Sequence, residues 1–182
     1  MIKIDDLFEV LLNDTDFDYD RINEIVDVNY VLDHMQNIIV QAAALSRYFW
    51  PPPEGVKNAK EIYTHRGIYL REQFNMLDTN ILKDRKLRNM IEHFDEKLDN
   101  YLQDDIVGHI IPQMISFKKG VDEVPLHIFR AYYLDTGEFE MLGKKCELKP
   151  IMDEVKKIHE YLLFFDENGG SIKGKHNTKI DT

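Results

Sequence analysis

The chain has 182 residues, of which 43% are hydrophobic and 31% charged, and its formal net charge is −10. This length is sufficient for one domain with its own core, while no apolar run reaches the roughly 18–20 residues that a membrane span needs. The start of the chain has no basic stretch followed by an apolar one, and Cys146 is the single cysteine, so we expect a cytoplasmic protein without membrane segments or internal disulfides.

The acidic charge is distributed unevenly along the chain. Residues 1–28 contain nine acids against Lys3 and Arg21, a net charge of 2 − 9 = −7. Residues 57–88 contain eight bases against four acids, a net charge of 8 − 4 = +4. An acidic surface repels nucleic acid, whereas a local basic region can bind it, although such imbalance is also common in solvated surface helices.

The first half of the sequence predicts helices. Residues 1–19 form an acidic N-terminal arm, and residues 20–49 carry apolar or small side chains three or four residues apart, with Asp20 as a possible cap. The prolines that begin at Pro51 end this helix, because proline lacks the N–H donor. Further helices are expected over residues 56–75, 80–102 and 105–117, the last one interrupted near Pro112.

The pattern changes after residue 126. Two runs rich in β-branched and aromatic residues flank Asp135-Thr-Gly137, which predicts a β-hairpin within residues 127–148. Pro150 favours the first turn of a final helix over residues 150–165, and residues 168–182 are expected to be a flexible tail. The prediction is therefore one mainly all-α domain over residues 20–167: a four-to-five-helix bundle with a C-terminal hairpin and a final helix.

One short segment suggests chemistry. Arg88-Asn89-Met-Ile-Glu92-His93 lies on the predicted helix 80–102, and its polar side chains share the face away from the apolar seam through Ile91, Phe94, Leu98 and Tyr101. RNA cleavage by the neighbouring 2′-hydroxyl needs a group that takes up a proton and a cation that holds the phosphate. Histidine and arginine supply these two functions, and an asparagine can orient either of them.

These residues resemble the signature of the HEPN superfamily (higher eukaryotes and prokaryotes nucleotide-binding), an arginine and a polar residue followed by a histidine. The longer string from Leu87 to Leu98 is similar to an uncharacterised bacterial HEPN-like group, and Ser46-Arg-Tyr-Phe-Trp-Pro51 also resembles that group. The resemblance covers residues 20–115 and does not account for the hairpin or the last helix. Asp95 and Glu96 depart from many active members, because acids beside a phosphate site weaken anion binding.

The resemblance implies a helical bundle, often a homodimer, and a metal-independent endoribonuclease of the toxin or defence type. RNA would be the substrate, and an antitoxin or a nucleotidyltransferase-type protein would be the partner. Arg88, Asn89 and His93 would be the catalytic residues, with no cofactor and no metal. Weaker substrate contacts are expected from four further side chains: His65, Arg66, Arg71 and Glu92.

Other interpretations of the same residues remain open. Arg88 and Glu92 can form an ordinary i,i+4 pair on a solvated face, and the protein can be a non-catalytic helical module that binds a protein or a nucleotide. A metal site is a further alternative, with ligands from Glu61, His65, Glu92, His93, Asp95 and Glu96. Trp50 can serve as a stacking platform or as a packed helix end, and the seam through Leu98 as a core or a dimer interface.

Overall fold

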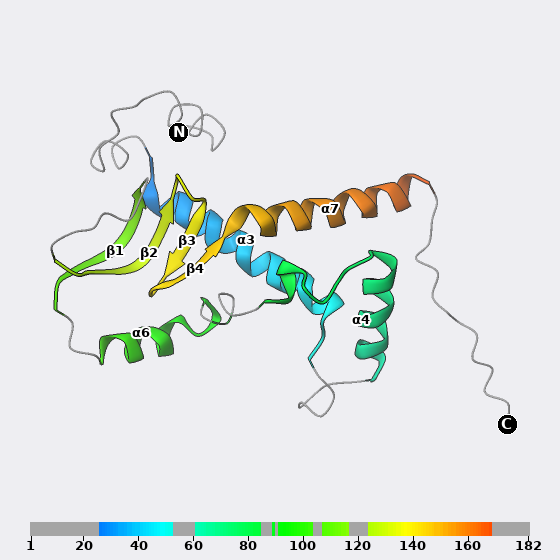
Figure 1. Ribbon diagram of the computed structural model, residues 1–182, viewed down its shortest axis with the longest axis horizontal. Helices are drawn as coiled ribbons and strands as arrows, with labels where there is room; N and C mark the ends of the chain where they lie inside the picture. Colours follow the sequence, from blue (N-terminus) through cyan, green and yellow to red (C-terminus); the bar gives the residue numbers. More distant parts are fainter. Residues whose placement is uncertain are drawn as a thin grey trace. The chain divides into compact units, whose positions relative to one another are not determined.

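The structure is a computed structural model of the chain, and it describes residues 26–52, 61–84, 89, 91–103, 107–116 and 124–168 (Figure 1). The predicted acidic arm, the capping role of Asp20 and the predicted tail beyond residue 168 lie outside the described residues. The chain divides into two compact units. We call Met1–Gln41 with Arg85–Lys149 the sheet unit, and Ala42–Asp84 with Pro150–Thr182 the helical unit.

The sheet unit contains four strands in the order β1-β2-β3-β4 (Figure 1). They are β1 (His109–Ser116), β2 (Leu126–Tyr133), β3 (Glu138–Met141) and β4 (Lys144–Glu147). β1 pairs with β2 in parallel, and the other two pairs are antiparallel. The fold is therefore α/β with a mixed sheet, and the prediction of a mainly all-α bundle is wrong.

The largest local error concerns residues 105–117, which were expected to be a helix and contain strand β1. The three isoleucines of β1 favour a strand, and Pro112 disfavours a helix interior. Pairing from His109↔Leu126 to Ser116↔Tyr133 satisfies the strand's backbone along one side. A proline is compatible with β1 because this strand is at one end of the strand order.

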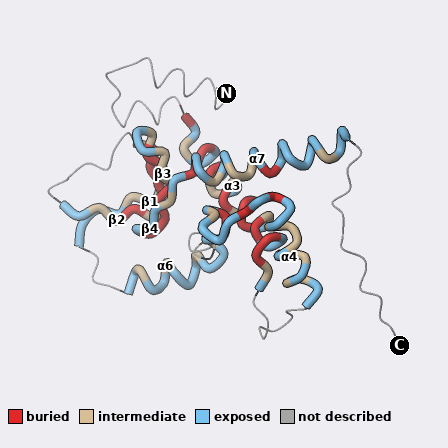
Figure 2. Tube along the Cα trace, turned by 45° about the vertical axis from the view of Figure 1, so that its right-hand side comes forward, coloured by how far each residue is buried: buried red, intermediate tan, exposed pale blue. Residues whose placement is uncertain are grey.

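The predicted hairpin is confirmed, and it is part of a larger sheet. β2 and β3 pair from Arg130↔Met141 to Tyr133↔Glu138, and Gly137 lies in the turn with a φ of 66°. A second tight turn at Leu142 and Gly143, both with positive φ, connects β3 to β4. The burial of the sheet is greatest in β2 and β3 (Figure 2).

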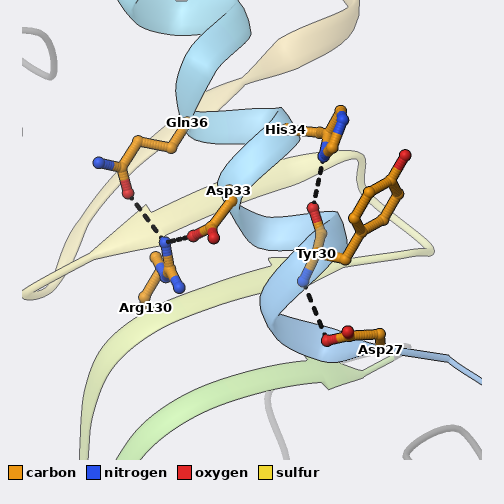
Figure 3. Close-up of polar contacts among 6 residues, drawn as sticks. All are labelled: Asp27, Tyr30, Asp33, His34, Gln36 and Arg130. Atoms are coloured by element: carbon orange, nitrogen blue, oxygen red, sulfur yellow. Dashed lines mark hydrogen bonds and ion pairs between the residues drawn. The ribbon is translucent and has the colours of Figure 1, made fainter.

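Helix α3 (Val28–Phe49) supplies the main apolar contact of the sheet unit. Asp27 begins the helix, because its carboxylate accepts a hydrogen bond of 3.1 Å from the backbone N–H of Tyr30. The buried stripe predicted for the first helix is confirmed. In the sheet unit its members Leu32, Met35 and Ile39 pack with buried strand residues: Ile115, Tyr132, Phe139 and Met141. Arg130 of β2 also donates to Asp33 at 2.6 Å and to Gln36 at 3.0 Å (Figure 3).

The opposite side of the sheet carries a buried polar cluster. Strand alternation places Tyr133 on the face away from Arg130, and Glu140 is on that same face because it pairs with Ala131. The Tyr133 hydroxyl donates to the Glu140 carboxylate at 2.7 Å, and Lys145 Nζ lies 3.6 Å from that carboxylate. Burial and the Glu140 carboxylate raise the pKa of Tyr133 well above its usual range.

The helical unit has its own apolar core. It is formed around α4 (Glu61–Gln73), the short 3-10 helix η1 (Ile81–Lys83), the end of α3 and α7 (Leu148–Glu167). The buried members are Ala42, Phe49, Trp50, Phe74, Met76, Leu82 and Ile158. The predicted final helix is confirmed by α7, and Trp50 is a packed helix end. Among the described helices, none has the length and apolar character needed to cross a membrane.

Candidate functional site

The predicted catalytic motif lies just before and at the start of helix α6 (Phe94–Leu102) in the sheet unit. Arg88 is outside the described residues. Asn89 and Glu92 are helical and exposed, and the backbone carbonyl of Asn89 accepts a hydrogen bond of 3.2 Å from the His93 N–H. Asn89 and His93 are therefore one helical turn apart, as the sequence predicted.

The expected continuous helix over residues 80–102 is wrong. The 3-10 helix η1 ends at Lys83, and Asp84 after it has an extended backbone. His93 then interrupts the later helical residues with φ −118° and ψ 37°. The backbone carbonyl of His93 still accepts a hydrogen bond of 3.0 Å from the Lys97 N–H. The histidine is thus the residue that immediately precedes α6.

Two acidic residues, Asp95 and Glu96, closely follow His93. Its side chain is 57% exposed, and its Nδ1 lies 3.9 Å from the carboxylate of Glu96, which is 69% exposed. Asp95 and Glu96 are both in the first turn of α6, where the helix dipole stabilises negative charge. The Glu96 carboxylate can orient the imidazole, while both acids oppose the approach of a phosphate.

Helix α6, which follows this exposed histidine, packs against the sheet. Ile91, Phe94, Leu98 and Tyr101, predicted as one apolar seam, pack against the core of the sheet unit, which supports the core interpretation of that seam. The Tyr101 hydroxyl forms a hydrogen bond of 2.9 Å with His127 Nδ1 on β2. Burial, with a smaller effect of the Glu140 charge, raises the pKa of Tyr101. The Tyr101–His127 pair has no local sequence signal, because it depends on strand placement.

Three of the four weaker predicted contacts do not belong to the same unit as His93. His65, Arg66 and Arg71 lie on α4 in the helical unit, whereas Glu92 is in the sheet unit with His93. His65 Nε2 is 3.7 Å from the Glu61 carboxylate, an ordinary i,i+4 surface pair. Arg71 donates to the backbone carbonyl of Phe49, so this side chain contributes to the packing of α4 against the end of α3.

Arg66 is the predicted contact with an unusual environment. Its guanidinium carbon lies 5.0 Å from the ring centroid of Tyr48 and 5.3 Å from that of Tyr63. Sequence reasoning did not single out either tyrosine. Tyr63 precedes Arg66 by three residues on one helix, which is a usable local signal, whereas Tyr48 comes from α3 and gives none.

The metal alternative finds no support in the described geometry. Among the residues that the structure describes, no three His, Cys, Asp or Glu side chains gather closely enough to hold a metal ion. His65 and Glu61 belong to the helical unit, whereas Glu92, His93, Asp95 and Glu96 belong to the sheet unit.

The comparisons with known proteins identify no relative. No protein-family model, no curated protein and no solved structure matches this chain. The mixed sheet also departs from the helical bundle that the HEPN resemblance implies.

Proposed function

We propose that the protein cleaves RNA without a metal ion, with His93 as the group that moves the proton. The observation that carries this proposal is the position of His93: a solvent-exposed imidazole at a helix break, one turn after Asn89, with a carboxylate 3.9 Å from its Nδ1. Because Glu96 lies on the Nδ1 side of the His93 ring, Nε2 is the nitrogen that can act on a substrate.

The proposed reaction uses the substrate's own 2′-hydroxyl. His93 takes the proton from that hydroxyl, the 2′-oxygen forms a bond to phosphorus, and the bond from phosphorus to the 5′-oxygen breaks. A proton delivered to the leaving oxygen completes the step, which yields a 2′,3′-cyclic phosphate and a 5′-hydroxyl. In this proposal Asn89 orients the reacting groups, and Arg88 neutralises the phosphate as its charge increases.

The test is cleavage of several labelled RNAs with a chelator present, comparing the wild type with His93→Ala. We expect the variant to lose at least about 100-fold in rate, because general acid–base catalysis contributes roughly 10²–10⁴-fold. His159→Ala is the matched control, since His159 is an exposed histidine on α7. Its activity should equal that of the wild type.

Two results would reject the proposal. Cleavage that survives in His93→Ala would place the activity elsewhere or in a contaminant. A wild type that cuts none of the RNAs, although it is folded by circular dichroism, would leave Asn89, Glu92 and His93 as a solvated helix face. The non-catalytic binding module would then become the better description.

A further inference from the structure

We infer that Arg66, Tyr48 and Tyr63 form a binding patch for an unpaired nucleotide of single-stranded RNA. This inference rests on the proposed RNA substrate and assigns its first contact outside the catalytic motif. The three side chains lie in one unit, Tyr48 on the last turn of α3 and the other two on α4. We call them the arginine–tyrosine patch.

The first argument is an unsatisfied donor. The Arg66 Nε is buried and has no hydrogen-bond partner within the described part of the chain. A buried N–H without an acceptor is costly, so most such groups in proteins are paired. A phosphate oxygen is the kind of acceptor that a guanidinium group engages best, because the geometry of its N–H groups matches phosphate oxygens. We expect the Arg66 side chain to shift when a phosphate binds, because its Nε is closed to a ligand in the unbound structure.

The second argument is the aromatic surface around the charge. The Arg66 guanidinium lies within cation–π distance of both tyrosine rings, and Tyr48 is 55% exposed. An exposed phenol ring beside an arginine offers a base a stacking surface and offers its phosphate a charge. This combination is the usual means of binding single-stranded nucleic acid without reading its sequence.

The third argument is the close packing of the two helices that carry the patch. Gly67 allows α4 to approach the end of α3 closely, because a Cβ at this position would lie 2.6 Å from Pro51 Cδ and 2.7 Å from the Phe49 carbonyl oxygen. Arg71 donates to that same carbonyl. These contacts place the backbone of Arg66 beside the last turn of α3, which carries Tyr48.

Two acidic side chains of the helical unit have partners other than Arg66. Asp78 forms a pair of 3.2 Å with Lys83 and accepts a hydrogen bond of 3.4 Å from the Trp50 indole. Both contacts lower the pKa of Asp78. Glu61 pairs with His65. Within the described part of the chain, Glu61 and Asp78 therefore do not neutralise the Arg66 charge.

The experiment measures the fluorescence anisotropy of a labelled 2′-O-methyl oligouridylate titrated with the full chain in the presence of a chelator. This probe lacks the 2′-hydroxyl nucleophile, so cleavage cannot affect the result. We expect Tyr48→Ala and Arg66→Ala each to raise the Kd roughly tenfold, as expected for the loss of one stacked base or one phosphate contact. A base-paired duplex of the same length should bind more weakly than the single strand.

The controls remove the same chemical groups elsewhere. Lys157→Ala deletes one exposed positive charge of the helical unit, and Tyr30→Ala deletes a tyrosine that is 39% exposed in the sheet unit. Both should bind as the wild type does. Because Tyr48→Ala changes an exposed ring and keeps Arg66, it tests the patch even if Arg66→Ala folds poorly.

The inference is overturned if the wild type does not bind the probe, if Tyr48→Ala binds unchanged, or if the duplex binds equally well. Its failure is separable from that of the proposed function. RNA cutting that depends on His93, with binding unaffected by Tyr48→Ala, would reject the patch alone. Binding that depends on Tyr48 and Arg66, without any cleavage, would reject the proposed reaction and support the patch.

Discussion

Glu140 is the one charged side chain that is buried among the described residues, with 2% of its surface exposed. The Tyr133 hydroxyl, which is itself buried, donates a hydrogen bond to it, and Lys145 lies at the edge of the pair, 36% exposed. Burying a carboxylate is costly unless donors and opposite charge compensate for it. The stability of the sheet unit should therefore depend on single polar atoms in this cluster.

We predict that Tyr133→Phe lowers the free energy of unfolding by about 1–3 kcal/mol, the usual cost of leaving a buried acceptor without its donor. Urea denaturation at neutral pH measures the loss. Tyr30→Phe is the control, because Tyr30 is partly exposed, and its stability should stay within about 0.5 kcal/mol of the wild type. An unchanged midpoint for Tyr133→Phe would mean that the remaining contacts of the carboxylate, Lys145 among them, compensate for the lost hydrogen bond.

At the scale of elements, α4 is held against the end of α3 by Gly67. We predict that Gly67→Ala destabilises the protein by about 1–3 kcal/mol, although alanine is the better helix former, because the added methyl group would overlap the Phe49 carbonyl and Pro51. Thermal unfolding with Thr64→Ala as the control measures this effect. A stabilised Gly67→Ala would show that the two helices separate easily.

Periodicity predicted those elements whose apolar faces repeat locally. The stripe of α3, with Leu32, Met35 and Ile39, and the final helix α7 were found in this way. β1 was missed because its apolar run also fits a helix, although its isoleucines and Pro112 favour a strand; the pairing with β2 is what establishes the strand. The break at His93 was missed for a related reason: the sequence continues the helical spacing through it.

The candidate site shows the same division between local and distant information. Polar residues such as His93 and Arg66 could be selected from residue type and spacing. The contact between Arg66 and Tyr48 could not, because it needs α4 to lie against the end of α3, with Gly67 at the point of close approach. The hydrogen bond from Arg71 to the Phe49 carbonyl could not be predicted either, because no sequence pattern reveals a backbone acceptor on another helix.

For the whole molecule, the net charge of −10 constrains how RNA can bind. Long-range repulsion opposes the approach of a polyanion, so binding must come from short-range contacts that displace few counterions. The arginine–tyrosine patch is of this kind, since Arg66 provides one charge and the tyrosines provide stacking. If instead the eight bases of residues 57–88 all contacted phosphates, counterion release would dominate the affinity.

The salt dependence of binding separates these two cases. For single strands, log Kobs falls with log salt with a slope of about −0.7 per phosphate neutralised, so contact with one to three phosphates predicts a slope between about −0.7 and −2. Contact by all eight bases would give a slope of about −6. Added salt also screens the repulsion between the acidic chain and RNA, which flattens the slope further. Anisotropy titrations at several KCl concentrations measure it, and a slope near −6 would show that the basic stretch as a whole, and not the arginine–tyrosine patch, binds the RNA.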